Sequence, residues 1–189
     1  APTAQRAVEL YTQYLKSKPG HSPAALSNRA SQYWHLGQLE NAEADFKAAT
    51  SDLSMSSANT VANFGNFLTR MHRSDEAVQL LSAALKYSPS SSVINSSLAS
   101  LLKATDPRKA VELFEKAQQF GADCCAPLAE LYNQLGMEDK ELEALHVLIA
   151  KNPTSPYVPA RRRRMGELRR LRQQAREQQS VFDRMRGQV

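Results

Sequence analysis

The sequence is poor in the residues that characterise several common classes of protein. Its two cysteines are adjacent, at 124 and 125. A disulfide-stapled miniprotein is therefore excluded, because the only intramolecular bridge would be strained. Seven glycines and nine prolines in 189 residues exclude collagen-like and low-complexity chains. No apolar run approaches the roughly 20 residues that a membrane-spanning helix needs. The remaining composition, 42% hydrophobic and 23% charged, predicts one domain or a short repeat array.

Motifs for catalysis and for nucleotide or metal binding are also missing. The sequence contains no GxSxG elbow, no GxxxxGK[ST] loop and no GxGxxG fingerprint. Its four histidines form neither an HExxH motif nor a tight His/Cys cluster. Because Cys124 and Cys125 are not spaced as CxxC, we predict that they are buried or half-buried structural thiols. We therefore predict no enzymatic activity, no cofactor, no metal and no small-molecule substrate. The histidines are His21, His35, His72 and His146.

Basic charge is concentrated at the end of the chain, where it is carried by arginine and not by lysine. The whole chain has 24 Lys+Arg and 19 Asp+Glu, a net charge of +5. Residues 161–189 contain ten Arg and three acids, or +7, which leaves 14 basic and 16 acidic residues, or −2, for residues 1–160. Guanidinium groups make planar, forked contacts to carboxylates and phosphates. The tail is therefore a candidate binding surface.

A short pattern repeats along the body of the chain. Each copy has a leading Ala, an aromatic residue or Leu four positions later, and usually another Ala three positions further on. The leading positions are 35, 35, 33 and 31 residues apart. Alanine on a helix lets a neighbouring helix approach closely, and the large residue one turn later fills the gap. The leading residues are Ala7, Ala42, Ala77 and Ala110, and Glu141 in a fifth, altered copy.

A second amphipathic segment lies between successive copies of this pattern. These segments are PAALSNRASQYWHLG, TVANFGNFLTRM, VINSSLASLLKA and PLAELYNQLG, and each is followed by a short polar turn. Their apolar residues recur at helical spacing, and the chain shows no period-2 alternation. The sequence therefore predicts an all-α fold of repeated helix–turn–helix units.

This pattern resembles the tetratricopeptide repeat (TPR) family. In VANFGNFL…EAVQLLSAALKYSP, the family's signature residues are matched by Phe64, Gly65, Leu68, Ala77, Leu81, Ala84 and Pro89. Phased copies at about 34-residue spacing make the resemblance specific. It covers roughly residues 4–153 and implies a right-handed superhelix of antiparallel helix pairs.

The expected organisation is a solenoid of residues 1–153 followed by a proline-containing linker and Arg-rich C-terminal helix over 154–189. The solenoid would contain a leading half unit (4–19), which ends at Pro19, and complete units at about 23–54, 58–89, 91–120 and 122–153.

The start of the chain is consistent with a cut or processed protein. It begins with Ala and not Met, and its first unit has only a second helix. Either a leader has been removed or the chain derives from something longer, so a docking or regulatory portion of a larger enzyme remains one alternative. The adjacent unpaired thiols favour a reducing compartment such as the cytoplasm, although the sequence leaves the compartment open.

The resemblance also implies where a ligand would bind. In TPR proteins the first helices of the units line a concave face that is the usual binding surface. Here that face would be rich in Asn and Ser, which can donate and accept hydrogen bonds along an extended peptide. Asn28 and Asn63 occupy equivalent places in successive units and resemble the asparagine ladders of some family members. Ser27, Ser31, Val93 and Ser97 stand where a carboxylate clamp would need Lys, Asn, Lys and Arg, which argues against a cochaperone. The predicted peptide-binding residues are Asn28, Ser31, His35, Asn59, Asn63, Asn66, Arg70, Ser97, Ser100, Lys103 and Asn133.

The Arg-rich tail reads as a final helix from Pro159 with a sparse apolar stripe. Three interpretations compete: a helix that caps the last repeat, a helix that pairs with another protein or with itself, and an electrostatic arm for nucleic acid or an anionic membrane. Phe182 is the only aromatic residue after Arg161, and the stripe is thin, so protein partners rank first. The predicted basic surface comprises Arg161, Arg162, Arg163, Arg164, Arg169 and Arg170.

These observations predict a non-enzymatic adaptor or scaffold. Its groove would bind a peptide segment or helix of a partner protein, with Tyr33, Trp34 and His35 beside the entry. The alternative is that the Arg-rich helix binds nucleic acid or an anionic surface and the solenoid serves as a platform.

Overall fold

A computed structural model describes residues 2–17 and 22–186, and within these ranges the backbone forms α-helices and no β-strand. Pro19, His21 and residues 187–189 lie outside the described residues. The chain divides into two compact units, Ala1–Ala122 and Asp123–Val189. The all-α fold expected from the sequence is thus confirmed, whereas its division at residue 153 stays a prediction.

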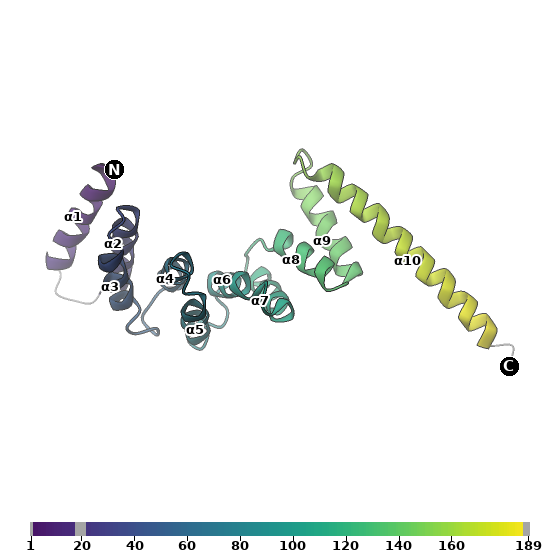
Figure 1. The fold of residues 1–189 in the computed structure, drawn as a ribbon, viewed down its shortest axis with the longest axis horizontal. Helices are drawn as coiled ribbons and strands as arrows, with labels where there is room; N and C mark the ends of the chain where they lie inside the picture. The colour runs from purple at the N-terminus through teal and green to yellow at the C-terminus, as the bar shows by residue number, and fades with distance from the viewer. Residues whose placement is uncertain (1, 18–21, 187–189) are drawn as a thin grey trace. The chain divides into compact units, whose positions relative to one another are not determined.

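The first unit is a series of helix pairs joined by short turns (Figure 1). α2 contacts α3 and α4, α4 contacts α5 and α6, and α6 contacts α7, while α1 packs on α2. Successive first helices of the pairs, α2, α4 and α6, therefore lie against one another. The helices are α1 (Pro2–Ser17), α2 (Pro23–His35), α3 (Leu39–Ala49), α4 (Ala58–Arg70), α5 (Ser74–Ala84), α6 (Ser92–Leu102) and α7 (Pro107–Gln119).

The second unit contains one helix pair and a long last helix. α8 (Cys125–Gln134) packs on α9 (Glu138–Lys151), and α9 packs on α10 (Val158–Arg186). The buried residues of α10 are Val158, Met165 and Leu168, so only its first part contributes to the core. From Arg169 to Arg186 every residue of α10 is exposed.

The repeated Ala–large–Ala pattern forms the helix contacts that the sequence predicts. In α3, Ala42, Phe46 and Ala49 are all fully buried, and the corresponding residues of α5 and α7 are buried as well. Close approach at the alanines leaves a space that the large side chain fills. α9 differs because the buried residue at its leading position is Glu141.

An aromatic cluster connects the first two complete helix pairs. The ring of Phe46 lies 5.5 Å from that of Phe64 and 5.4 Å from that of Phe67, between ring centroids. Trp34 meets Phe67 edge-on at 5.6 Å. Such pairs add roughly 0.5–1.5 kcal/mol each beyond the burial of their area. The cluster therefore fixes how α3 and α4 pack.

Side-chain caps and left-handed residues set the limits of several helices. Ser57, Ser91 and Asp106 each accept a hydrogen bond from a backbone N–H three residues later, which satisfies a free donor of the first turn. In the turn within each of three helix pairs, one residue adopts a positive φ. It is Gly37 (74°) after α2 and Gly136 (67°) after α8, but His72 (59°) after α4. Glycine adopts this conformation without strain, whereas a histidine does so at a cost.

An ion-pair cluster joins α3 to the start of α5. Glu43 of α3 lies 2.8 Å from Lys47 Nζ and 2.9 Å from Arg73 Nη1. The hydrogen bond from Lys47, aided by the one from Arg73, holds the pKa of Glu43 below its usual range, against the opposing effect of burial.

Candidate functional site

The contacts of α2, α4 and α6 bring most of the predicted peptide-binding residues onto three neighbouring helices. Together with Lys103, which directly follows α6, these residues differ in accessibility: six are exposed and four are half-buried. Exposure is what a ligand contact requires, so the first group is the better candidate set. The exposed residues are Asn28, His35, Asn59, Asn66, Arg70 and Ser100, and the half-buried ones are Ser31, Asn63, Ser97 and Lys103.

A cavity of about 290 Å³ lies between α4 and α6 and brings three of these residues together. Asn66 of α4 and Ser97 and Ser100 of α6 line it. Gly65, Leu81 and Leu101 supply apolar surface, and Thr69 and Ser96 add hydroxyl groups. An alanine at position 65 would place its Cβ 3.3 Å from Leu81 Cδ1, so glycine also keeps α4 close to α5. The cavity combines apolar surface with hydrogen-bonding groups that carry no charge.

The Ser100 hydroxyl of this cavity donates to the Ser96 carbonyl at 2.9 Å, so it can offer a ligand its acceptor capacity. Two other predicted contact residues also have partners inside the protein. Asn63 donates from Nδ2 to Ser27 Oγ at 3.4 Å, which joins α4 to α2. Ser31 donates from its hydroxyl to the Ser27 carbonyl at 3.0 Å. Ser27 itself is buried. A ladder through Asn28 and Asn63 stays a prediction, and the Asn63 amide would have to exchange this long hydrogen bond for one to a ligand.

Of the residues expected beside the groove entry, His35 is the accessible one. Trp34 is half-buried, packs on Phe67 and lies parallel to the His35 ring at 6.4 Å between centroids. Tyr33 is also half-buried and lies beneath the guanidinium of Arg29 at 5.7 Å. Both rings therefore contribute to packing.

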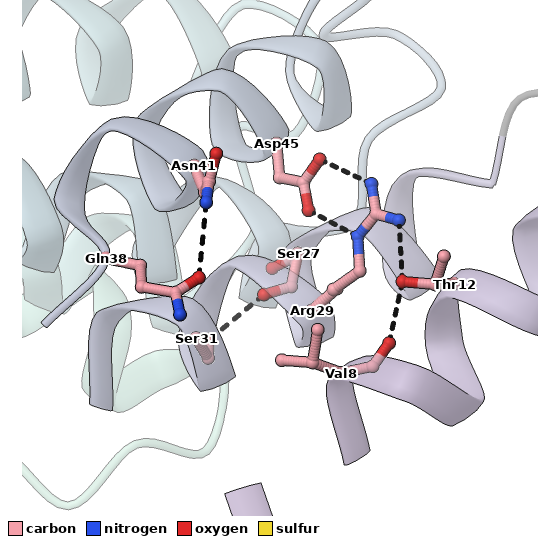
Figure 2. Close-up of polar contacts among 8 residues, drawn as sticks. All are labelled: Val8, Thr12, Ser27, Arg29, Ser31, Gln38, Asn41 and Asp45. Atoms are coloured by element: carbon pink, nitrogen blue, oxygen red, sulfur yellow. Dashed lines mark hydrogen bonds and ion pairs between the residues drawn. The ribbon is translucent and has the colours of Figure 1, made fainter. Parts of the chain in front are cut away.

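A buried ion pair that the sequence did not reveal joins the first three helices (Figure 2). Arg29 of α2 donates from Nε and Nη2 to the two carboxylate oxygens of Asp45 in α3, at 2.7 and 2.8 Å. Its Nη1 also donates to Thr12 Oγ1 of α1 at 3.1 Å, and the Thr12 hydroxyl donates to the Val8 carbonyl. The hydrogen bonds to Asp45 raise the pKa of Arg29, although burial opposes them. The only sequence signal for this pair was the position of Asp45 next to Phe46, the large residue of the repeated pattern.

The second unit has its own cavity, of about 460 Å³, lined by the predicted residues Asn133, Arg161 and Arg164. Alanines of α8 and leucines of α9 form its apolar walls. The Arg161 guanidinium lies over the exposed Tyr157 ring, 5.8 Å from its centroid. The buried residue Glu141 also lines this cavity.

Two of the predicted site residues bind the carboxylate of Glu141. Arg164 donates to its two oxygens from Nε and Nη2, at 2.8 and 2.9 Å, and Asn133 donates to Oε1 at 3.0 Å. These bonds to Glu141 raise the pKa of Arg164. Arg164 and Asn133 thus neutralise and solvate a carboxylate whose side chain is 3% exposed. The departure from Ala at position 141 was the sequence signal for this site.

The other predicted basic residues lie on the surface of α10. Arg162, Arg163 and Arg170 are exposed. Arg169 lies with its Nη2 3.0 Å from His146 Nε2 of α9. The structure thus separates Arg164, which is held by Glu141, from the accessible arginines.

The two cysteines form no disulfide and both are buried, as the sequence predicts. Burial raises the pKa of both thiols, and in Cys125 the nearby Lys151 opposes this effect. A thiol with a raised pKa stays protonated near neutral pH and is a poor nucleophile.

Within the described residues, no group of three or more His, Cys, Asp or Glu side chains could hold a metal ion. In the same part of the chain, no helix is long and apolar enough to cross a membrane. What the two cavities offer is hydrogen bonding, apolar contact and fixed charge, which are the means of binding.

Comparison with known proteins agrees with this architecture. Residues 23–51 match the tetratricopeptide repeat family. No curated protein matches the chain in sequence. Among solved structures, pilF of Pseudomonas aeruginosa is 18% identical with a TM-score of 0.65, over 80% of this chain and 70% of that one. A thermophilic TPR protein of Thermus thermophilus is 19% identical with a TM-score of 0.59, over 87% of this chain and 90% of that one. YrrB, described as a TPR protein with an unusual peptide-binding site, is 16% identical with a TM-score of 0.62, over 86% and 84%.

The chain therefore contains a tetratricopeptide repeat and has the all-α helical-repeat fold of TPR proteins. Identities this low carry the fold and no finer property. The fold is typical of protein–protein interaction adaptors, and TPR-repeat proteins are generally non-enzymatic.

Proposed function

We propose that this protein is an adaptor whose first unit holds an extended segment of a partner protein along α2, α4 and α6. The observation that carries the proposal is the cavity between α4 and α6, where Asn66, Ser97 and Ser100 surround apolar surface. An extended peptide presents alternating backbone donors and acceptors, which amide and hydroxyl groups can both satisfy.

The chemistry of this cavity also defines the segment that would fit. Its lining carries no charged side chain, and its volume of about 290 Å³ is small. A small aliphatic side chain would contact Leu81 and Leu101, while the backbone on either side would bond to Asn66 and Ser100. A strongly charged segment would lose hydration without gaining an ion pair.

The fold supports the same proposal in a general way. A solenoid of helix pairs presents a continuous row of first helices, which is the surface that repeat proteins use for binding. The description of YrrB as a TPR protein with a peptide-binding site is consistent with this use of the fold.

A displayed library of random peptides, selected on the full chain, tests the proposal. Selected peptides are titrated against the wild type and against the double variant Asn66→Ala with Ser100→Ala. We expect their affinity for the variant to fall roughly thirtyfold, since two direct hydrogen bonds worth about 1 kcal/mol each are lost.

The control is Ser82→Ala, which removes an exposed hydroxyl from α5 outside the cavity. Affinity for this variant should equal that of the wild type. Peptides that bind the double variant as tightly as the wild type, or a selection that yields no binder, would contradict the proposed groove.

A further inference from the structure

The second half of α10 presents an apolar face that nothing in the described residues covers. Leu171, Phe182 and Met185 are 45%, 53% and 66% exposed, and Val181 is exposed beside them. Gln174, Glu177, Gln178 and the apolar residues 181, 182 and 185 line a shallow hollow on this face. Four large exposed apolar side chains on one helix are unusual for a surface that meets only water.

This face continues the one that packs on α9. Counting from the buried Leu168, positions 171, 175, 178, 182 and 185 follow in steps of three and four, which is the a/d spacing of a helix that packs along a second helix. They are occupied by Leu, Ala, Gln, Phe and Met. Of the a and d positions of α10, Leu168 is buried, Arg161 and Arg164 before it are half-buried, and every position from Leu171 to Met185 is exposed. The other buried residues, Val158 and Met165, lie at the adjacent e positions.

The charge next to this face indicates what could cover it. The flanking e and g positions are Arg172, Gln174, Gln179, Val181 and Arg186, which include two arginines and no acid. Residues 169–186 carry six Arg and two acids, or +4. The Arg186 guanidinium lies 5.4 Å from the centroid of the Phe182 ring, so charge and apolar surface are adjacent.

A second copy of the chain fits this surface poorly. Antiparallel pairing would bring the Arg172 end of one helix against the Arg186 end of the other. Parallel pairing would place two segments of +4 side by side and offer no attractive e–g pair between exposed positions. A helix with acidic flanks has the complementary charge.

We propose that residues 171–186 of α10 form a docking face for an amphipathic α-helix of a partner protein, with apolar residues along its seam and Glu or Asp beside it. The apolar seam covers Leu171, Phe182 and Met185, and the partner's acids pair with Arg186 and with Arg172. The Arg172 Nη1 lies 3.4 Å from Asp139 Oδ1 of α9, so an acid of the partner would share or replace this exposed ion pair. The docking face lies in the second unit and is independent of the groove proposed in the first.

A designed peptide tests the docking face without knowledge of the natural partner. The probe is a labelled helix of three heptads with Leu at a and d and Glu at e and g. It is titrated against the full chain by fluorescence anisotropy. Two control peptides are used: one with Lys in place of Glu, and one with the same composition in scrambled order.

We expect the Glu peptide to bind and each control peptide to bind at least roughly tenfold more weakly. The Lys peptide repels the arginines, and the scrambled peptide has no apolar seam. Binding should weaken as the salt concentration is raised fourfold, because the flanking ion pairs are exposed.

Matched variants locate the contact on the helix. Phe182→Gln should reduce affinity roughly tenfold, as loss of a buried aromatic anchor does, and Arg186→Gln should reduce it severalfold. Gln173→Ala and Arg184→Gln change the opposite side of the same helix and should leave it unchanged. All four residues are exposed, so far-UV circular dichroism should show unaltered folding.

If the scrambled peptide binds as tightly as the Glu peptide, charge alone explains the binding and the proposal is overturned. Dimerisation in analytical ultracentrifugation that Phe182→Gln abolishes would also overturn it, because a second copy would then cover the face. Displacement of the Glu peptide by an RNA oligonucleotide or by anionic vesicles at lower concentration would assign the surface to phosphate binding. The Asn66→Ala, Ser100→Ala variant should bind the Glu peptide normally, which separates this test from that of the groove.

Discussion

Removing one partner of the ion pair between Arg29 and Asp45 should destabilise the first unit more than removing a partner of any of its exposed pairs. Asp45→Asn keeps the shape of the side chain and removes its charge. The Arg29 side chain is only 18% exposed and that of Asp45 11%, so the guanidinium would remain without its counter-charge in a largely dry site. Breaking a buried pair in this way costs about 3–5 kcal/mol. With a urea dependence of about 2 kcal/mol/M, the unfolding midpoint should fall by about 1.5–2.5 M.

Urea denaturation measures this effect locally, because the single tryptophan, Trp34, lies on the same helix as Arg29. The double variant Arg29→Met with Asp45→Leu completes a thermodynamic cycle. Replacing both charges with apolar groups should recover most of the loss and end within about 1 kcal/mol of the wild type.

A matched control lies two residues further along α3. Lys47→Gln removes an exposed partner of Glu43 and should change the free energy of unfolding by less than about 1 kcal/mol. The reasoning is refuted if Asp45→Asn is as mild as this control. It is also refuted if the double variant loses the sum of the two single effects, because the two side chains would then not be coupled.

Three further sets of substitutions should change the free energy of unfolding in a predictable direction. Arg164→Ala should destabilise the second unit by about 3 kcal/mol, because it leaves the buried carboxylate of Glu141 without its counter-charge. Glu141→Ala should cost less than half as much, because the Arg164 side chain is 33% exposed and reaches water. Hydrogen exchange of α9 and α10 measures both effects, and a larger cost for Glu141→Ala would contradict the assignment. His72→Gly should stabilise the first unit by about 0.5–1 kcal/mol in urea denaturation, since the positive φ of this residue suits glycine, and a loss of stability would show that the turn is not strained. Glu43→Gln should lower stability at neutral pH by less than about 1 kcal/mol. Because the pKa of Glu43 is lowered in the folded state, its contribution is complete above the ordinary value of 4.5 and lost as the pH falls through the folded value. The two proteins should therefore become equally stable in acid, and a difference that persists there would reject an electrostatic origin.

Local sequence was sufficient to predict the helices and the way in which they pair. The spacing of Ala42, Phe46 and Ala49, and its recurrence about 35 residues later, places small and large residues on one helix face wherever the chain folds. Because hydrophobic periodicity is a property of neighbouring residues, it can be read without knowledge of distant contacts. The burial of the cysteines was predicted on another local ground, because Cys124 and Cys125 are not spaced as a CxxC motif.

The pairing of charges was decided only by tertiary structure. Arg29 and Asp45 are 16 residues apart, and Arg164 and Glu141 are 23 apart. Whether such side chains meet depends on helix packing and on which face of each helix is buried. From sequence, Arg164 was indistinguishable from Arg162 and Arg163, yet it alone of the three lies against a buried carboxylate.

How much of the apolar stripe of α10 is buried was likewise decided only by tertiary structure. The apolar stripe of this helix was visible in the sequence, and its continuation past Leu168 was not marked by any change in pattern. α9 has 14 residues and α10 has 29, so α9 covers only the first part of α10. The stripe is therefore buried at Met165 and Leu168 and exposed from Leu171 onward. A repeating pattern determines which face of a helix is apolar, whereas the lengths and packing of neighbouring helices determine how much of that face is left for a partner.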